Sequence, residues 1–316
     1  IAEIEKEIGK PITEMVDLFA GTSAGSIVIG FLNIPDAQGK QKFTAAQAVG
    51  LSQNVITKLF DNSLFRKIRT LGGLAGAKYS AKPLEGFLNQ YLGDLTVANT
   101  VKPVLITSVD LKTNQIFNFS TRYGKEWPKM FNLPMQLAIR ASTAAPVYFQ
   151  PVGVELESGA KLVLADGGII ALSPEVLAII EARLRYPGRK YILISLSTGR
   201  FQGERKVAAT GINSGSALKM IEPFIGASLG GQLSLNSIYM QDQVNRGDLE
   251  YYRVDIGVTK EGSSLDDASI KNLQYLKQVG LDTAAKNPTF NKIVNRLNDV
   301  ENSKMSMREF LRASAR

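Results

Sequence analysis

Residues 17–26 read Asp-Leu-Phe-Ala-Gly-Thr-Ser-Ala-Gly-Ser, an apolar strand that runs into a Gly-x-Ser-x-Gly turn. An apolar stretch at residues 27–32 follows and is predicted to form a helix. Strand, turn and helix in this order are the layout of a nucleophile elbow, in which a strained turn exposes a serine at the tip of a strand. The pattern predicts that Ser23 is a nucleophile.

The residues around Ser23 are small, as such a turn requires. Gly21 and Gly25 are expected to let the strand and the helix approach each other, with Thr22 and Ala24 completing the turn. The first N–H groups of a helix have no partner within it, so they are free to bind an anion above the serine. We therefore expect the backbone N–H of Ala24 to contribute to an oxyanion hole.

The composition of the chain limits which catalytic groups and metal ligands it can use. The chain has 316 residues, 44% of them hydrophobic and 21% charged, which indicates a globular protein of one large domain or two. It contains no histidine, so a Ser-His-Asp triad is excluded and a carboxylate or a lysine must take the serine's proton. It contains no cysteine, which excludes thiolate metal sites and a cysteine nucleophile.

The net charge is +8, which is either a solvated basic surface or an attraction to anionic lipid. Because the basic residues are scattered and no aromatic-interleaved basic tract occurs, we do not expect nucleic acid as a partner. No apolar run approaches the roughly 18 residues of a membrane span. These features favour a soluble protein, cytoplasmic or secreted, that acts peripherally at membranes.

Predicted strands and helices alternate along the chain, which indicates a single α/β domain. Strands are expected at residues 103–110, 115–120, 161–164 and 191–197, the first two joined by a turn at 112–114 and the last central and parallel. Expected helices include residues 44–60 and 268–279, the latter capped by Asp266 and Asp267, and helices from 214 to 244 interrupted by Pro223 and Gly230-Gly231. Residues 71–76 are expected to form a flexible connector, either an ordinary loop or a lid.

A second motif, Asp166-Gly167-Gly168, follows the strand at 161–164. Open α/β sheets bind ligands at the carboxyl ends of their strands, so Asp166 is a candidate base. Asp-Gly-Gly is also a favourable turn, and Asp110 and Asp255, near other strand ends, are expected to be caps or turns. Lys78 or Lys82 is an alternative base, because a buried lysine can lose its proton.

Together the two motifs resemble the patatin-like phospholipase family, from Ile1 to the helix near Val279. Further matching stretches are Gly9-Lys10-Pro11-Ile12, Phe19-Ala20, Ala144-Ala145-Pro146 with Tyr148-Phe149, and Leu265-Asp266-Asp267-Ala268-Ser269. The resemblance implies a three-layer α/β fold with a central, mostly parallel sheet flanked by helices. It also implies a Ser–Asp dyad without histidine, in which Ser23 is the nucleophile, Asp166 is the base, and Gly21, Gly25, Gly167 and Gly168 shape the turns.

Two departures from the family pattern stand out. The family's glycine-rich oxyanion loop precedes its first helix, so the remaining oxyanion donors and the first strand are expected upstream of Ile1. The helix after Asp166 begins Leu172-Ser173-Pro174, where the family usually has an Asn-Asn-Pro-like run. We expect one catalytic domain over residues 1–316, with a helical C-terminal extension at 283–316.

The resemblance implies a lipid acyl hydrolase of the phospholipase A or lysophospholipase type, which forms an acyl-enzyme and needs no metal or cofactor. Its expected partners are membrane phospholipid or another acyl lipid, and a protein activator. The main alternative is a catalytically inactive module that binds lipid or protein. A thioesterase or acyltransferase built on the same elbow is a further alternative, although such transferases typically pair serine with histidine.

Overall fold

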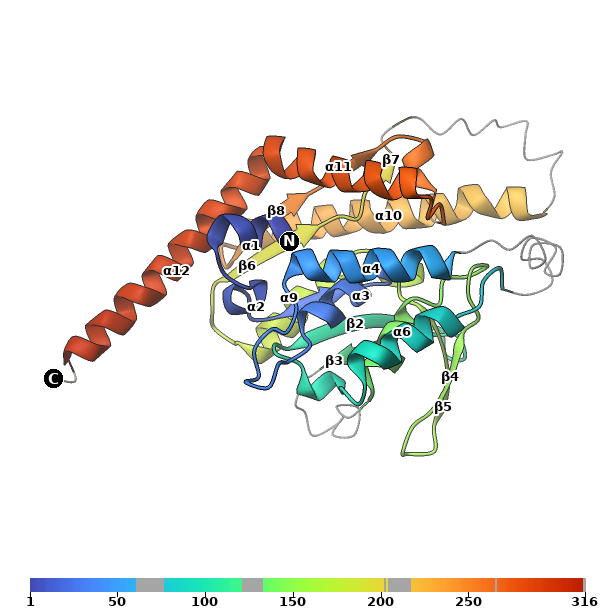
Figure 1. Ribbon diagram of the computed structural model, residues 1–316, viewed down its shortest axis with the longest axis horizontal. Helices are drawn as coiled ribbons and strands as arrows, with labels where there is room; N and C mark the ends of the chain where they lie inside the picture. Colours follow the sequence, from blue (N-terminus) through green and yellow to red (C-terminus); the bar gives the residue numbers. More distant parts are fainter. Residues whose placement is uncertain (61–76, 121–132, 202, 204–216, 265, 315–316) are drawn as a thin grey trace.

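The computed structural model describes residues 1–60, 77–120, 133–201, 203, 217–264 and 266–314 (Figure 1). The connector predicted at 71–76 lies outside these residues. The principal helices are α1 (Ala2–Ile8), α2 (Ile12–Met15), α3 (Ala24–Leu32), α4 (Ala45–Leu59), α6 (Lys82–Leu92), α7 (Met135–Ser142), α8 (Gly168–Ala171), α9 (Glu175–Arg185), α10 (Ala217–Asn245), α11 (Ile270–Lys286) and α12 (Pro288–Ser314). The strands are β1 (Phe19–Gly21), β2 (Val104–Asp110), β3 (Gln115–Ser120), β4 (Val152–Glu155), β5 (Lys161–Asp166), β6 (Tyr191–Leu196), β7 (Arg200–Phe201), β8 (Leu249–Val254) and β9 (Gly257–Val258).

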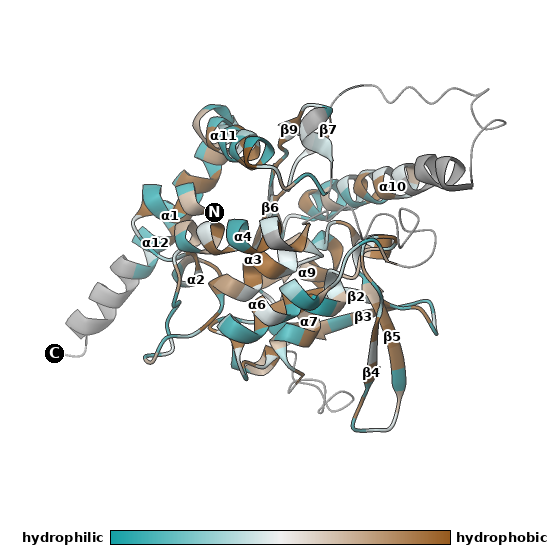
Figure 2. Ribbon diagram, turned by 45° about the vertical axis from the view of Figure 1, so that its right-hand side comes forward, coloured by the Kyte–Doolittle hydropathy of each residue, from teal (hydrophilic) through white to brown (hydrophobic). Residues whose placement is uncertain are grey.

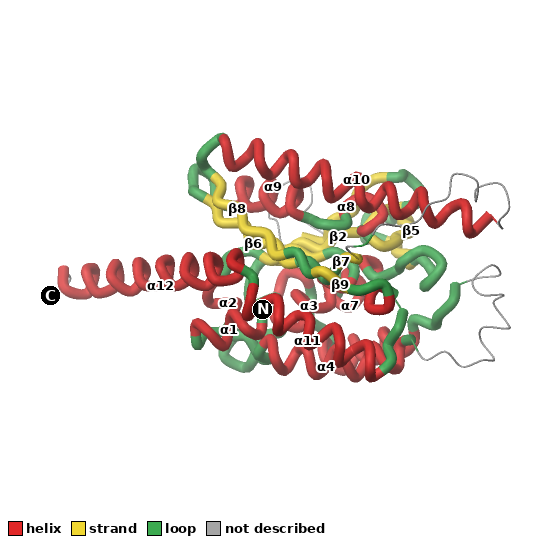
Figure 3. Tube along the Cα trace, turned by 90° about the horizontal axis from the view of Figure 1, so that it is seen from above, coloured by secondary structure: helices red, strands yellow, loops and turns green. Residues whose placement is uncertain are grey.

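The strands form the middle of three layers, with α9 and α10 on one side and α3, α4 and α11 on the other (Figure 3). The predicted α/β fold with flanking helices is therefore confirmed. The five-stranded sheet itself is mixed rather than mostly parallel, since β1 runs parallel to β2 while β3 and β5 run antiparallel to it. A tight turn joins β2 to β3, and a tight turn can only connect antiparallel strands. β5 comes from a distant part of the chain, so no local turn sets its direction relative to β2.

Strand β2 is buried along its whole length and organises this sheet. One edge of β2 pairs with β3 from Leu105 to Asp110. Since a strand has two edges, β1 and β5 must share the other one. β1 covers its first part, ending with Gly21 opposite Ile106, and β5 covers its last part, ending with Asp166 opposite Ser108. The carboxyl ends of β1 and β5 therefore meet head to head, on either side of Thr107.

The apolar run predicted as a central parallel strand forms β6, which pairs in parallel with β8 from Tyr191↔Leu249 to Leu196↔Val254. Among the described pairings, this ladder stands apart from the five-stranded sheet, as does the short parallel pair of β7 and β9. β6 and β8 pack with α9 and α10 around a small apolar cluster of Ile179, Tyr191, Met240 and Leu249. β6 is thus parallel as predicted, but it lies beside the main sheet rather than at its centre.

The main core lies between the five-stranded sheet and the helices α3, α6 and α7. Phe31 of α3, Leu88 of α6 and Ile139 of α7 are completely buried there. In Figure 2 the hydrophobic colour is strong on α3 at the centre of the molecule, whereas α11 at the surface carries more of the hydrophilic colour. This core supports the helix that starts directly after Ser23.

Helix α10 differs from the prediction, because it runs unbroken from Ala217 to Asn245 through Pro223 and the Gly230-Gly231 pair. Glycine lowers helix propensity by about 1 kcal/mol, which tertiary contacts can override. Two such contacts are side-chain hydrogen bonds, from Gln232 to the Ile169 carbonyl and from Asn236 to the Ser173 carbonyl, at 2.9 and 2.8 Å. None of the described helices combines the length and apolarity required to cross a membrane.

The C-terminal helix α12 begins inside the main core and then projects away from the body of the molecule (Figure 1). Phe290, Ile293 and Leu297 are buried against the same cluster as Ile4 of α1. Lys10 and Glu301 add an ion pair of 2.7 Å between the two ends of the described chain. The first half of α12 is therefore part of the folded core, while the division of the chain into one domain and an extension stays a prediction.

Replacing Ile293 with alanine tests this role of α12. Because Ile293 is fully buried, Ile293→Ala is expected to lower the free energy of unfolding by about 2–5 kcal/mol. Ile270→Ala on α11 is the matched control, since its side chain is 72% exposed and its loss should change stability by no more than about 0.5 kcal/mol. Equal effects of the two variants in urea denaturation would contradict the packing of α12 into the core.

Candidate active site

Ser23 occupies the turn between β1 and α3 with φ of 50° and ψ of −120°. A positive φ is strained for any residue other than glycine and persists only where the surroundings impose it. The Ser23 side chain is half-buried, and the next residue, Ala24, is exposed. The predicted nucleophile therefore lies in a strained turn that remains open to solvent on one side.

Gly21 is the glycine that this turn requires. A Cβ built on Gly21 lies 2.7 Å from the carbonyl carbon and oxygen of Gly25, so any side chain there collides with the start of α3. A Cβ on Gly25 meets no described atom within 4 Å. Gly21 therefore allows the close approach of β1 and α3, as expected. Gly25 is not needed for this approach, because a side chain would fit there.

Asp166 is the last residue of β5 and is buried, with only 5% of its surface exposed. The chain then turns closely past β2, because a Cβ on Gly167 lies 2.5 Å from the Thr107 carbonyl oxygen. The backbone N–H of Gly168 donates a 2.7 Å hydrogen bond to Asp166 Oδ1. The two glycines thus have separate roles, close passage at Gly167 and fixing of the carboxylate at Gly168.

Buried hydroxyl groups join the two turns. Thr22 Oγ1 donates to the Ala171 carbonyl oxygen at 2.8 Å, which ties the elbow to α8. Thr22 Oγ1 also lies 2.7 Å from Thr107 Oγ1. A hydroxyl has one proton and the Thr22 proton is already used, so Thr107 must be the donor in this second bond. Thr22, which the motif only suggested to be small, therefore links the elbow to β2 and to the segment after Asp166.

The segment at the end of α7 contacts both turns. The Ser23 N–H donates to Ser142 Oγ at 2.9 Å, and Ser142 has no exposed surface. The Asp166 N–H donates to the Ala144 carbonyl oxygen at 3.1 Å. No local signal in the sequence marked Ser142 as a hydrogen-bond acceptor.

The carboxyl group of Asp166 is poised to accept a proton. Burial raises its pKa above the ordinary value of 3.8, because desolvation disfavours the charged form. Interaction with the Ser23 side chain and the hydrogen bond from the Gly168 N–H favour the charged form and offset only part of this increase. Ser23 and Asp166, which are far apart in sequence, therefore interact through their side chains.

The start of α3 offers a donor beside Ser23. The N–H groups of Gly25 and Ser26 donate to the carbonyl oxygens of Thr22 and Ser23 at 2.8 and 2.9 Å. In the part of the chain that the structure describes, no acceptor is found for the N–H of Ala24. This exposed donor is available to a ligand oxygen placed above Ser23.

The alternative base Lys78 is engaged elsewhere. Its ammonium forms an ion pair with Asp266 and lies 5.2 Å from the centre of the Tyr79 ring. Burial alone lowers the pKa of Lys78, but its hydrogen bonds with Asp266 and Tyr79 outweigh burial and leave the pKa raised. Lys82 is exposed on α6. Lys78 therefore keeps its proton and is a poor candidate for the base.

The same contact corrects the expected helix cap. Asp266 does not cap α11, whose N-cap is Ser269, with its side chain accepting from the Asn272 N–H. Asp266 instead binds Lys78 and accepts a 2.6 Å hydrogen bond from the Tyr79 hydroxyl. Its partners are about 190 residues earlier in the chain, so local sequence could not identify them.

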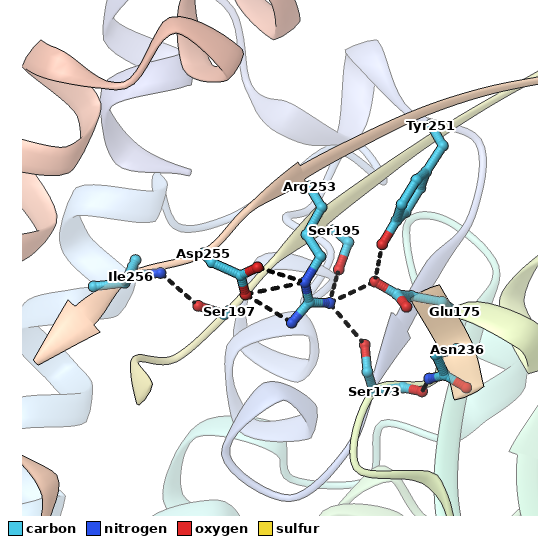
Figure 4. Close-up of polar contacts among 9 residues, drawn as sticks. All are labelled: Ser173, Glu175, Ser195, Ser197, Asn236, Tyr251, Arg253, Asp255 and Ile256. Atoms are coloured by element: carbon cyan, nitrogen blue, oxygen red, sulfur yellow. Dashed lines mark hydrogen bonds and ion pairs between the residues drawn. The ribbon is translucent and has the colours of Figure 1, made fainter. Parts of the chain in front are cut away.

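The segment that follows Asp166 is held by a polar network centred on Arg253 of β8 (Figure 4). Arg253 Nη1 donates to Glu175 Oε1 at 2.6 Å and to Ser195 Oγ at 3.0 Å. The Tyr251 hydroxyl donates to the same Glu175 oxygen at 2.8 Å. Because Glu175 is the first residue of α9, the network fixes the start of α9, and Ser173 lies within it where the sequence departs from the family pattern.

The structure thus brings together Ser23, Asp166 and the small residues of both motifs, while Lys78 is paired with Asp266 and Lys82 is exposed. It adds Thr107, Ser142 and Ala144, which sequence reasoning did not assign to the site. Among the described residues, no group of three or more histidine, cysteine, aspartate or glutamate side chains is placed to hold a metal ion. The site contains a serine, a buried carboxylate and a backbone N–H without an acceptor among the described residues, the groups used for acyl transfer.

The chain is similar to proteins of one family. The profile of the family described as Patatin-like phospholipase matches residues 4–179. Patatin-like protein 2 of Arabidopsis thaliana is 26% identical over 91% of this chain and 77% of its own length. Probable inactive patatin-like protein 9 of the same plant is 31% identical, over 56% of this chain and 47% of its own length. Among solved structures, VipD from Legionella pneumophila aligns at 13% identity and a TM-score of 0.33, and this chain covers 63% of its length.

The family profile covers more than half of the chain and includes both motifs. The chain therefore belongs to the Patatin-like phospholipase family, as predicted. At the level of the family, the activity is that of lipid acyl hydrolases, which act on acyl lipids. Some relatives carry names that mark them as probably inactive, such as the Arabidopsis protein 9 and a patatin of Solanum tuberosum.

The two elbow glycines give a matched test of the turn. Gly21→Ala forces a side chain into the backbone of α3 and is expected to lower the free energy of unfolding by about 1–3 kcal/mol. Gly25→Ala enters open space within a helix and is expected to be neutral or to stabilise by up to about 1 kcal/mol. Chemical denaturation of both variants checks this. A Gly25→Ala variant less stable than Gly21→Ala would be incompatible with the close approach at Gly21.

The raised pKa of Asp166 predicts a pH dependence of stability. As pH rises from 3.8 to the higher pKa of the folded state, the unfolded chain loses this proton while the folded protein keeps it, so the wild type loses stability. Asp166→Asn carries no such titration. Its melting temperature relative to wild type should therefore increase with pH up to that folded pKa and then stay level.

Asp110 provides a control, because its pKa is shifted in the opposite direction to that of Asp166. Burial raises its pKa, but hydrogen bonds from the Val163 N–H, the Thr113 hydroxyl and other groups outweigh burial, and the net pKa is lowered. Its charged form therefore stabilises the fold above 3.8, and this stabilisation is lost as pH falls through the folded pKa. Asp110→Asn should lose stability relative to wild type as pH rises. If the stability of both variants relative to wild type changed with pH in the same direction, the opposite pKa shifts of Asp166 and Asp110 would be refuted.

Proposed function

We propose that this protein is a lipid acyl hydrolase of the phospholipase A or lysophospholipase type that uses Ser23 as its nucleophile and Asp166 as its base. The observation that carries the proposal is the meeting of β1 and β5 on one edge of β2, which brings the strained Ser23 turn to a buried carboxylate with a raised pKa. Membership of the Patatin-like phospholipase family supports the choice of acyl lipid as substrate.

In the first half of the reaction, Asp166 accepts the Ser23 hydroxyl proton as Ser23 Oγ attacks the ester carbonyl carbon. The carbonyl oxygen gains negative charge and binds the Ala24 N–H, which has no other acceptor in the described part of the chain. The tetrahedral intermediate then expels the alcohol portion of the lipid, which leaves with the proton from Asp166. Ser23 is left as an acyl ester.

In the second half, Asp166 accepts a proton from a water molecule, which attacks the acyl carbon. The intermediate collapses, the fatty acid leaves and the proton returns to Ser23. A base with a pKa above the ordinary range is suited to both steps, because general-base catalysis is most efficient when the pKa approaches the working pH. Activity should therefore decline on acidification at a pH above 3.8, where Asp166 becomes protonated.

The second candidate is an inactive patatin-like module that binds lipid or protein. It is favoured by the relatives whose names mark them as probably inactive. Against it stand the interaction of Ser23 with the buried Asp166 carboxylate and the Ala24 N–H, for which the described residues supply no acceptor. A purely binding role needs neither.

The proposal of a lipid acyl hydrolase also includes peripheral action at anionic membranes, helped by the net charge of +8, and a protein activator.

Activity and active-site labelling of three proteins test the dyad. Wild type is expected to hydrolyse acyl esters and to react with a fluorophosphonate probe at Ser23. Ser23→Ala should lose both properties with its melting curve unchanged. Asp166→Asn keeps the size of the side chain but cannot accept a proton, so turnover should fall by about 10²–10⁴-fold.

The double variant separates a dyad from two independent residues. Because groups that act as a unit are not additive, Ser23→Ala with Asp166→Asn should be no less active than Ser23→Ala alone. A folded Asp166→Asn enzyme with near wild-type turnover would remove Asp166 from the mechanism. A wild type that neither hydrolyses ester nor reacts with the probe would favour the inactive module.

A further inference from the structure

The Ser23 turn is fixed through its backbone. The Ser23 carbonyl oxygen accepts hydrogen bonds from Ser26 Oγ at 2.6 Å and from the Ser26 N–H at 2.9 Å. The Ser23 N–H donates to Ser142 Oγ at 2.9 Å. Ser26 belongs to the helix that begins at the turn and moves with it. Ser142 is the last residue of α7, so its bond ties the turn to a different part of the molecule.

Ser142 lies where it can set the position of one reacting group relative to the other. It is completely buried, so water cannot replace its hydroxyl as the acceptor for Ser23. Two residues later, the Ala144 carbonyl accepts the Asp166 N–H at 3.1 Å. One short stretch of backbone therefore holds the nucleophile turn at one end and the residue that carries the carboxylate at the other.

We propose that Ser142 is a positioning residue for the Ser23 nucleophile. Its hydroxyl oxygen, by accepting the Ser23 N–H, holds Ser23 in its positive-φ conformation and directs the Ser23 hydroxyl toward Asp166. A non-glycine residue leaves such a conformation readily unless contacts impose it. Among the described residues, the hydrogen-bond partner of the Ser142 side chain is the Ser23 N–H rather than the Ser23 hydroxyl or the Asp166 carboxylate, so it acts through Ser23. This inference rests on the proposed function in naming the reaction that Ser142 serves.

The next residue in the chain supplies a matched control. Thr143 is also buried at the end of α7, and its hydroxyl donates to the Ile139 carbonyl of the same helix at 2.8 Å. Ser142→Ala and Thr143→Val each remove one buried hydroxyl from adjacent positions. Only Ser142→Ala removes a contact with Ser23, so a difference between the two reports on the position of the nucleophile rather than on packing.

The kinetic test compares the two variants in ester hydrolysis. Ser142→Ala should lower kcat by on the order of 10²-fold, because a small misplacement of a reacting group has effects of this size. KM should stay within about twofold of wild type, since the substrate contacts are unchanged. Ser142→Cys, whose sulfur is a weak acceptor in nearly the same place, should recover part of the loss. Thr143→Val should keep wild-type kcat with a similar change in melting temperature.

A second measurement does not depend on activity. Hydrogen exchange of the Ser23 amide, followed by NMR, should be slow in wild type and in Thr143→Val and clearly faster in Ser142→Ala. Faster exchange in Ser142→Ala alone supports the positioning of Ser23 by Ser142. If wild type also hydrolyses no ester, the proposed function fails but this positioning role is still supported. Unchanged exchange in Ser142→Ala, or equal losses of kcat in both variants, would overturn the proposal.

Discussion

The site depends on a constraint in the sheet, namely that two strands share one edge of β2. β1 and β5 approach each other from opposite directions, and neither can extend without entering the space of the other. Their ends are separated by the single position of Thr107. Gly167 passes so close to the backbone of Thr107 that no side chain would fit at position 167. The meeting of Ser23 with Asp166 is therefore a consequence of strand register, and a shift of either strand along β2 would separate them.

Hydroxyl groups satisfy the backbone where the two strands end. Ser108 Oγ donates to the Ala165 carbonyl at 2.6 Å. Thr22 donates to the Ala171 carbonyl, and Ser142 accepts the Ser23 N–H. Buried polar groups of this kind are costly unless paired, and when paired they fix one arrangement of the chain. The result is a carboxylate that is poorly solvated yet held in place, which raises its pKa without removing its hydrogen bonds.

Much of this arrangement was predictable from the sequence, for physical reasons that are local. The elbow at Ser23 and the hairpin of β2 and β3 depend on neighbouring residues. The exclusion of a Ser-His-Asp triad needs only the composition, because the chain has no histidine. The mixed sheet was missed because strand direction across β2 is set by which strands share its edges. The ion pair of Lys78 with Asp266 and the acceptor role of Ser142 join residues more than 100 positions apart, and no local pattern encodes them. The roles of Ser23 and Asp166 in catalysis stay predictions.

The packing of α1 against α12 has a consequence for how the chain is made. Ile4 and Ile293 belong to the same core, and Lys10 and Glu301 are 291 positions apart. At translation rates of about 5–20 residues per second, the partner of α1 leaves the ribosome about 15–60 s after α1 itself. During that interval the apolar face of α1 has no native surface from α12 to cover it. The apolar face of α1 in the nascent chain therefore stays without its native cover until α12 has been made.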